Sequence, residues 1–335
     1  MRILILGGTV FLSATLARDA LERGHEVTCL ARGASAAPPA GVRFVPADRD
    51  DGPAAYEGAA GRWDAVLDVS RQPNHVRDAL EALADRAGHW TFVSSGSVYA
   101  NFDDPPALDE SAELLPALAA GLISTPETYG EAKVACEHYA RDAVGDRLHI
   151  SRAGLIAGPG DPTDRFGYWP GRFARRPPSP VLVPDARADD SQVIGVDDLS
   201  RWLLEAAESG LSGTYNSYGD TYPLGEVIDL AAQVAGSATR QVAVDHDWLV
   251  EHEVAYWAGP ESLPLWLPPS YSGFRSRSNA AARAAGLRLA PLADLMADCL
   301  ADEQAKGLDR PRKAGLSAAH ESALLEQWQS QAATA

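Results

Sequence analysis

The feature that most limits the possible folds is a regular alternation of short apolar runs with helical patterns over the first half of the chain. Strands buried on both faces of a parallel sheet have continuous apolar stretches, whereas half-buried strands alternate apolar with polar residues. Right-handed crossovers then wind the chain outward in both directions from the first strand. We therefore predict an α/β fold with a doubly wound parallel sheet, whose strands are residues 3–6, 26–30, 42–45, 65–69, 90–93 and 148–152.

Charge and apolar content limit the kinds of partner. The chain has 335 residues, 46% of them hydrophobic, and a net charge of −17. Because an acidic surface repels phosphate backbones, we expect no nucleic-acid partner. The densest basic run, formed by Arg172, Arg175 and Arg176, is interpreted as a solvated loop. No apolar run has the length of a membrane span, so no membrane partner is expected.

The three cysteines, Cys29, Cys136 and Cys299, are not spaced like metal ligands. An odd number of cysteines without such spacing is typical of reduced thiols in a cytoplasmic protein. We expect no metal site, and we interpret each cysteine as a small core residue.

The first strand runs directly into a glycine turn with the sequence Gly7-Gly8-Thr9-Val10-Phe11-Leu12. A turn between a strand and a helix offers free N–H groups and the positive end of a helix dipole to a pyrophosphate. Glycines let the backbone turn sharply and approach the phosphates. Val10 and Ser13 stand where a Gly-x-x-Gly-x-x-Gly pattern has its second and third glycines, so a βα turn that binds nothing would also fit.

Two further groups of polar residues stand where such a sheet binds ligands. Tyr129 and Lys133, in a helix predicted over residues 126–144, are four residues apart and share one helix face. A nearby ammonium lowers the pKa of a phenol and makes it usable as an acid or a base. Ser95 ends the fifth strand, at the edge where a hydroxyl can hold a substrate oxygen. Each pattern alone also arises by chance.

Taken together, the glycine turn, Ser95 and the pair of Tyr129 and Lys133 resemble the NAD(P)-dependent epimerase/dehydratase family of extended short-chain dehydrogenases. Segments 152–160, 196–199 and 213–216 match as well, and the resemblance covers about residues 1–235. It implies a Rossmann-type domain with Ser95, Tyr129 and Lys133 as the catalytic set. The cofactor-binding residues that we expect are Gly7, Gly8, Thr9, Val10, Phe11, Leu12, Arg32, Asp48, Arg49, Ser70, Lys133, Leu155 and Ile156.

Two lobes are expected. Residues 1–160 would form the dinucleotide-binding Rossmann domain, with residues 185–220 returning to its sheet, and residues 161–184 and 221–330 would form a smaller, mixed C-terminal substrate lobe. The stretch 158–184, dense in proline and glycine, is predicted to be loop. The stretch 248–274, rich in aromatic residues and proline, is predicted to shape the substrate pocket, although a small hydrophobic core under a long loop would look much the same.

Some positions depart from the family pattern. Gly96 and Ser97 stand where the dehydratases carry Asp and Glu, which argues against sugar dehydration. At the end of the second strand, Ala31 replaces the acidic residue that accepts the ribose hydroxyls of NAD. Arg32 follows it, with a guanidinium suited to a phosphate.

These departures favour NADP as the cofactor, with NAD as the alternative. Arg49 is expected to add a second phosphate contact, and Asp48, after the third strand, to lie at the adenine. A surface position for Arg49 and an ordinary acidic turn at Asp48 stay open.

The activity implied is hydride transfer at an alcohol or carbonyl of a small-molecule substrate, with Tyr129 as acid or base, Lys133 on the nicotinamide ribose and Ser95 on the substrate oxygen. Epimerisation of a sugar nucleotide or a related metabolite through a transient ketone uses the same machinery. A non-catalytic nucleotide-binding role is a third alternative, because the glycine turn is poor and a fold does not fix a function. The resemblance also makes a homodimer one option for the assembly.

Overall fold

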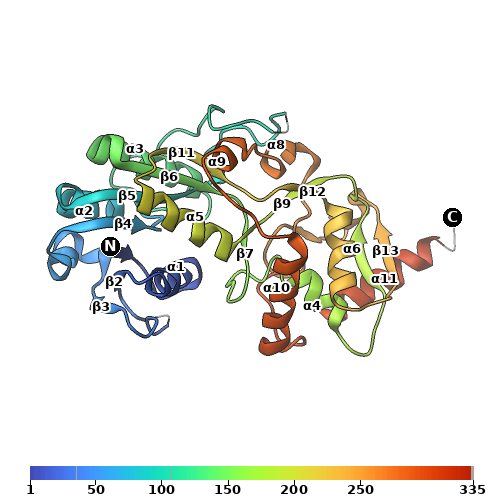
Figure 1. Ribbon diagram of the computed structural model, residues 1–335. Helices are drawn as coiled ribbons and strands as arrows, with labels where there is room; N and C mark the ends of the chain where they lie inside the picture. Colours follow the sequence, from blue (N-terminus) through green and yellow to red (C-terminus); the bar gives the residue numbers. More distant parts are fainter. Residues whose placement is uncertain (35, 106, 333–335) are drawn as a thin grey trace.

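The computed structural model describes residues 1–34, 36–105 and 107–332, which form two lobes (Figure 1). The first lobe is built on a parallel sheet of seven strands in the order β3-β2-β1-β4-β5-β6-β11. The predicted doubly wound sheet is therefore confirmed. Its strands are β1 (Arg2–Leu6), β2 (Glu26–Ala31), β3 (Arg43–Pro46), β4 (Trp63–Asp68), β5 (Ala87–Ser95), β6 (Leu148–Ala153) and β11 (Gly213–Ser217).

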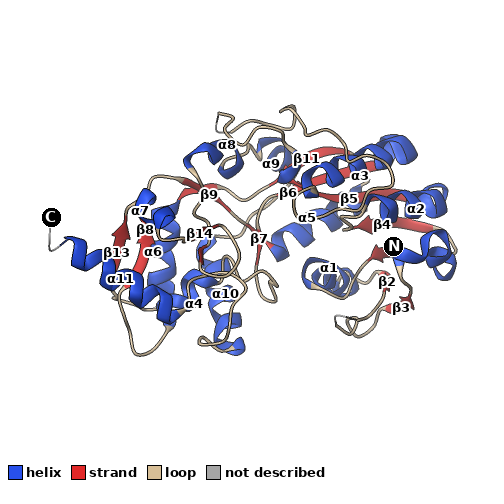
Figure 2. Ribbon diagram, turned by 180° about the vertical axis from the view of Figure 1, so that it is seen from behind, coloured by secondary structure: helices blue, strands red, loops and turns tan. Residues whose placement is uncertain are grey.

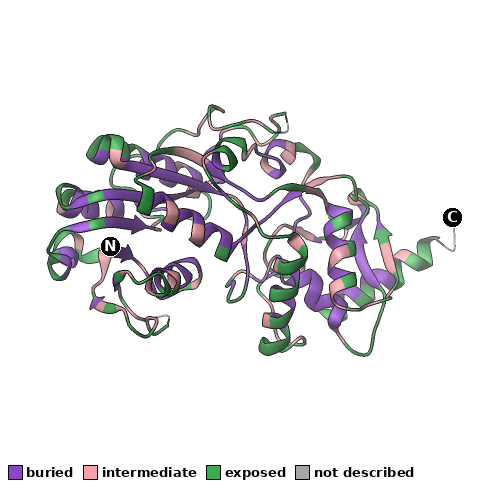
Figure 3. Cartoon of the chain, in the orientation of Figure 1, coloured by how far each residue is buried: buried purple, intermediate pink, exposed green. Residues whose placement is uncertain are grey.

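Helices cover both faces of this sheet because successive strand side chains point to opposite sides. In β1, Ile3 and Ile5 pack with α1 (Phe11–Glu22) and α5 (Val196–Ser209). Leu4 and Leu6 pack with the opposite layer, which contains α2 (Pro73–Leu83), α3 (Tyr129–Val144) and the 3-10 segment η1 (Arg49–Ala59). The central strands and the inner helix faces are accordingly buried, and the outer faces are exposed (Figure 3).

The strand order leaves an opening above the middle of the sheet. The chain moves from β1 to β2 on one side, whereas β4 lies on the other side of β1, so the segments after β1 and β4 diverge at the carboxyl edge. Ligands of open α/β sheets bind in the crevice that such a divergence creates. Strand β11 joins the sheet beside β6 and brings Tyr218, the residue after its end, to the same edge.

The second lobe contains short strand pairs surrounded by helices (Figure 2). Its core is rich in large side chains, among them Trp169, Trp266 and Ile228. The elements here and at the junction are β7 (Ile156–Ala157), α4 (Tyr168–Ala174), β8 (Val181–Pro184), β9 (Asp190–Gln192), β10 (Ile194–Gly195), β12 (Thr221–Pro223), α6 (Leu224–Val234), β13 (Gln241–Val244), α7 (His246–Glu251), β14 (Ala255–Tyr256), β15 (Ser262–Leu263), α8 (Ser272–Arg275), α9 (Ala280–Ala284), α10 (Leu292–Lys306) and α11 (Ala318–Ala332). Four short 3-10 segments complete the fold: η2 (Ala84–Arg86), η3 (Gly96–Val98), η4 (Gly145–Arg147) and η5 (Pro269–Tyr271).

The prediction of loop over residues 158–184 was wrong in part, because the segment contains α4 and β8. Pro170 lies in the first turn of α4, where a missing N–H breaks no helical hydrogen bond. Trp169 and Phe173 anchor this short helix in the core of the second lobe. Arg172 is also not solvated: it is buried and forms an ion pair with Glu321 of α11.

Smaller differences concern the ends of elements and the cysteines. Helix α3 begins at Tyr129 and not at residue 126, because Thr125 and Thr128 hydrogen-bond to each other in a turn that precedes it. The three cysteines are buried, as expected. Over the stretches that the structure describes, no helix has both the length and the apolar character that crossing a bilayer requires.

Candidate active site

Two cavities lie along the crevice at the carboxyl edge of the sheet. The inner cavity, of about 580 Å³, extends toward the second lobe, and the outer cavity, of about 430 Å³, extends over β2 and β3. Both are lined by Val10, Ser13, Val69 and Arg71, so they are two parts of one crevice. An elongated crevice with two chambers fits a dinucleotide that crosses the sheet at its switch point.

The glycine turn forms the floor between the two chambers. Gly7 and Gly8 have φ angles of +129° and +100°, which residues with a side chain rarely adopt. A Cβ atom on Gly8 would also lie 2.3 Å from Sγ of Cys29, so the turn depends on this glycine. Phe11, at φ +41°, is a strained residue of the kind that collects at ligand sites.

Helix α1 starts from this turn without a capping side chain, because Val10 at its N-cap makes no side-chain hydrogen bond. The N–H groups of a first helical turn have no partners within the helix. Together with the helix dipole they form an anion site, which suits a pyrophosphate. The missing second and third glycines therefore do not remove the features that a dinucleotide needs.

Lys133 is held at the base of the inner cavity. Its side chain is buried, and Nζ donates to the carbonyl oxygens of Ser70 and Val93, each at 2.7 Å. These carbonyls belong to the segments that follow β4 and form β5, so the ammonium fixes the helix α3 against the sheet edge. An ammonium has three N–H donors, and the third is available to a ligand in the cavity that Lys133 lines.

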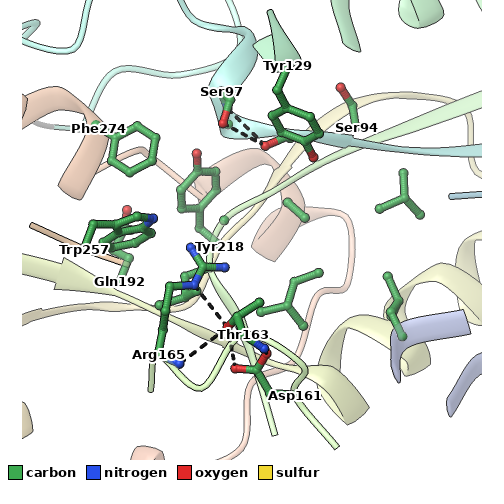
Figure 4. A pocket seen from close by; sticks show the side chains of 18 of the residues that line it. Ser94, Ser97, Tyr129, Asp161, Thr163, Arg165, Gln192, Tyr218, Trp257 and Phe274 are labelled. Carbon is green, nitrogen blue, oxygen red and sulfur yellow. Dashed lines mark hydrogen bonds between the residues drawn. The ribbon is translucent and has the colours of Figure 1, made fainter. Parts of the chain in front are cut away.

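Tyr129 lies one turn before Lys133, and the ammonium is 6.0 Å from the centre of its ring. Tyr129 is half-buried and lines the inner cavity, into which its side chain projects (Figure 4). Ser95, at the end of β5, lines the same cavity. Its hydroxyl accepts a hydrogen bond from the backbone N–H of Ser97 and donates one to the Ser97 hydroxyl, both at 3.2 Å. The structure thus brings together the three residues that the sequence predicts as catalytic.

The predicted cofactor-binding residues follow the crevice. Every one of them except Gly8 lines one of the two chambers. Leu155 and Ile156 line the inner chamber, and Ser70 lines the outer one. In the outer chamber, Arg32 is well exposed, and its guanidinium lies 3.8 Å from the Asp48 carboxylate.

The structure gives Arg49 a different task from the predicted phosphate contact. Its two terminal nitrogens donate to the two oxygens of Asp68, each at 2.9 Å, and Nε donates to the hydroxyl of Tyr56. Burial by itself lowers the pKa of Arg49, but the adjacent Asp68 carboxylate raises it above its ordinary value. Arg49 therefore supports the outer chamber from below, with four of its five N–H donors held by Tyr56, Asp68 and the His75 carbonyl.

Opposite the catalytic residues, the inner cavity has a wall of charged and polar residues that the sequence did not indicate. Arg165 lies 5.0 Å from the ring centre of Trp257, and its Nε donates to Thr163 at 3.2 Å. Burial lowers the pKa of Arg165 and raises that of the nearby Asp161. Arg275, buried and paired with Asp189, adds a second cation. Nothing in the spacing of these residues indicates a shared cavity, because they meet only through tertiary packing.

The aromatic stretch predicted to shape the substrate pocket is divided between two roles. Trp257 and Phe274 line the inner cavity (Figure 4). Trp248 and Trp266 lie in the core of the second lobe. The alternative of a hydrophobic core is thus confirmed for part of the stretch, and the role of the rest in a substrate pocket stays a prediction.

No family model matches the sequence, and no curated protein matches it. Solved structures do match its fold. A protein from Burkholderia cenocepacia, named as a candidate epimerase, has 22% identity and a TM-score of 0.69, over 91% of this chain and 98% of its own. A UDP-glucose 4-epimerase from Thermus thermophilus in complex with NAD has 20% identity and a TM-score of 0.61, over 91% of this chain and 99% of its own. A UDP-N-acetylglucosamine 4-epimerase from Bacillus cereus has 13% identity and a TM-score of 0.63, over 90% of this chain and 98% of its own. The expected resemblance is confirmed at the level of the fold.

Proposed function

We propose that the protein is a nicotinamide-dependent enzyme of the short-chain dehydrogenase type, which transfers a hydride at an alcohol or carbonyl of a small molecule. The observation that supports this most is the grouping of Ser95, Tyr129 and Lys133 in one cavity, which continues to the glycine turn at α1. The residues of the turn fit a pyrophosphate, and the base of the inner chamber offers the third N–H of Lys133. A nicotinamide cofactor would supply the hydride donor or acceptor there.

The chain's own residues would then hold the substrate and move one proton. Ser95 positions the substrate oxygen through its hydroxyl. Tyr129 gives a proton to that oxygen during reduction and takes it away during oxidation, at its own phenolic oxygen. Lys133 would hold the ribose of the cofactor, while its two bonds to backbone carbonyls keep α3 in place. Trp257, Phe274 and Arg165 form the wall that the rest of the substrate contacts.

A second candidate is epimerisation of a sugar nucleotide through a transient ketone. The fold comparison favours it, because structures with the same fold are named as UDP-sugar 4-epimerases, one of them in complex with NAD. Another structure with this fold, named MoeE5, is a complex with UDP-glucose and NAD. In this reaction the same proton and hydride steps run forward and then backward on the two faces of one carbon. Arg165 and Arg275, two of the cations that line the inner cavity, would suit a diphosphate.

We further propose NADP as the cofactor, although two of the matching structures are complexes with NAD. Ala31 carries no carboxylate to repel a 2′-phosphate, and Arg32 lines the outer chamber with an exposed guanidinium. In this scheme the first 160 residues, with residues 185–220, bind the cofactor. Residues 161–184 and 221–330 contribute the substrate wall.

Tyr129→Phe tests the proposed chemistry, since it removes only the hydroxyl that moves the proton. We expect turnover to fall about 100-fold or more, the usual scale of general acid–base catalysis, with the affinity for the cofactor retained. Steady-state hydride transfer, with UDP-glucose as the first substrate tried, measures it. Tyr139→Phe, on the same helix but outside both chambers, is the matched control. Normal turnover in the Tyr129 variant would refute its role.

A further inference from the structure

A second tyrosine, Tyr218, lies in the inner cavity and has no role in the proposed chemistry so far. It follows β11 directly, is 4% exposed and lines the cavity with Ser95 and Tyr129. Figure 4 shows its ring between the catalytic side and the Arg165 side of the cavity, with the hydroxyl end toward Ser97 and Tyr129. The sequence did not indicate this, because Tyr218 comes from a strand far along the chain from the other three residues.

Two glycines make room for the Tyr218 side chain. A Cβ atom on Gly96 would lie 1.6 Å from the Tyr218 hydroxyl oxygen, and one on Gly154 would lie 2.6 Å from a ring carbon. Neither distance is compatible with any larger residue. The phenol thus fills the space that a side chain at position 96 would occupy, directly after Ser95.

The glycine at position 96 changes which hydrogen-bond donors the site contains. Position 96 is one of the two places where the resembling dehydratases carry acids, and here it is a glycine. Tyr218 brings a phenol to that place from a different strand. A phenol is both a donor and an acceptor of hydrogen bonds, and it is neutral at ordinary pH.

The surroundings keep this phenol protonated. Burial raises the pKa of Tyr218, the neighbouring Tyr99 raises it further, and the nearby Arg277 and Arg152 lower it in part. Within the described part of the chain, no group forms a hydrogen bond with its hydroxyl, whereas its backbone carbonyl accepts one from Asn279 at 3.1 Å. The hydroxyl faces the cavity, where a ligand or water can accept its hydrogen bond.

We propose that Tyr218 is a second catalytic phenol, which donates a hydrogen bond to the substrate oxygen on the reacting carbon while Tyr129 moves the proton. This proposal rests on the proposed function. Tyr218 keeps its own proton throughout, so the hydride and the proton carried by Tyr129 balance the reaction without it. Its hydrogen bond strengthens as negative charge grows on the oxygen, and therefore it lowers the barrier more than it improves substrate binding.

A purely structural role is the competing explanation, because the ring packs against Gly96 and Gly154. Tyr218→Phe separates the two, since it keeps the ring and removes only the hydroxyl. Tyr222→Phe is the matched control: Tyr222 lies in β12, four residues further on, and lines neither chamber. Both variants should have the wild-type free energy of unfolding and the wild-type affinity for the cofactor.

The experiment measures hydride transfer in the full-length holoenzyme by nicotinamide absorbance. The probes are UDP-glucose with the oxidised cofactor and a stable 4-keto sugar nucleotide with the reduced cofactor. We expect Tyr218→Phe to lower kcat about 100-fold, the effect of losing one donor to a developing oxyanion, with little change in KM. Tyr222→Phe should resemble the wild type.

Three other outcomes would count against the proposal. A wild-type kcat in Tyr218→Phe, with Tyr129→Phe slow, overturns the role of Tyr218 and leaves the proposed function intact. A rise in KM alone, with kcat unchanged, would assign Tyr218 to substrate binding and overturn its catalytic role. If the wild type binds the cofactor but transfers no hydride with either probe, the proposed function and the role of Tyr218 are both rejected.

Discussion

In the proposed function, Arg32 is the side chain that would distinguish NADP from NAD. Its side chain is 63% exposed, and its partner Asp48, 3.8 Å away, is 40% exposed. Exposed ion pairs of this kind contribute little stability. A phosphate in the outer chamber could therefore replace Asp48 as the partner of Arg32 with little loss of free energy. Bidentate hydrogen bonds from the guanidinium would stabilise the new pair.

Replacing Arg32 with alanine tests this choice. We expect the affinity for NADP to fall at least about tenfold, because hydrogen bonds to a charged group contribute roughly 1.5–3 kcal/mol. The affinity for NAD should change little, since NAD has no 2′-phosphate. Titration of both cofactors by calorimetry measures the effect, with Arg43→Ala on β3 as a control that lines neither chamber. Tighter binding of NAD by the wild type would contradict the NADP assignment.

For single residues, the sequence predicted the positions of those whose partners are close in the chain or that belong to a known motif. Tyr129 and Lys133 share a helix face by spacing alone, and Ser95 ends a strand. The sequence did not indicate the ion pair of Arg49 or the place of Tyr218 in the cavity. The Arg49–Asp68 pair and the position of Tyr218 beside Gly96 exist only after β4, β5 and β11 have assembled.

Among the elements, helix α3 has the most demanding position, because it carries both Tyr129 and Lys133. One turn beyond Lys133, Glu137 forms a buried ion pair with Arg152 of β6, with bonds of 3.0 and 2.8 Å. Burial alone would raise the pKa of Glu137, but the Arg152 guanidinium holds it below the ordinary value. Residues 129, 133 and 137 are thus on one helix face, and the third of them docks the other two against the sheet.

Removing the buried cation should destabilise the protein strongly. We expect Arg152→Ala to cost about 3–5 kcal/mol of unfolding free energy, because it leaves a buried carboxylate without its partner. Arg141→Ala is the control. It removes the other arginine near Glu137, at 3.4 Å and 45% exposed, and should cost about 1 kcal/mol or less. Chemical denaturation compares them, and equal losses would show that the buried pair does not dock the helix.

The prediction of helices and strands succeeded where the apolar pattern fitted one kind of element and no other. The strands of the sheet were predicted to within a few residues, because continuous apolar runs between helices fit buried parallel strands. Helix α4 was missed because its proline and glycine are typical of loops, and only its burial in the second lobe stabilises it as a helix.

For the molecule as a whole, two buried histidines on the neighbouring strands β5 and β6 make the free energy of unfolding depend on pH. His89 of β5 and His149 of β6 have ring centres 6.5 Å apart. Burial lowers the pKa of His149 to about 3 and also lowers that of His89. In the unfolded chain both would titrate near pH 6.5. The unfolded state therefore binds more protons, and the stability present above pH 6.5 is lost as the pH falls toward 3.

His149→Phe should weaken this pH dependence. In the wild type we expect His149 to reduce the unfolding free energy by about 1.4 kcal/mol per pH unit as the pH falls through that window, and His89 to add to the slope. A phenylalanine keeps the ring stacked on Tyr215 and cannot be protonated. Thermal unfolding from neutral to acid pH measures the slopes, and His138→Gln on the exposed side of α3 is the control. Identical slopes in wild type and His149→Phe would exclude His149 as the cause.

The two lobes together create the crevice that the central claim concerns, since the sheet supplies the cofactor edge and the second lobe supplies the opposite wall. The measurement that tests the claim most directly is a crystal structure of the protein with NADPH. We expect the pyrophosphate against the backbone of residues 8–12, the adenosine ribose beside Arg32 and the nicotinamide ring beside Tyr129 and Lys133. A dinucleotide bound elsewhere, or an empty crevice at saturating NADPH, would contradict the claim.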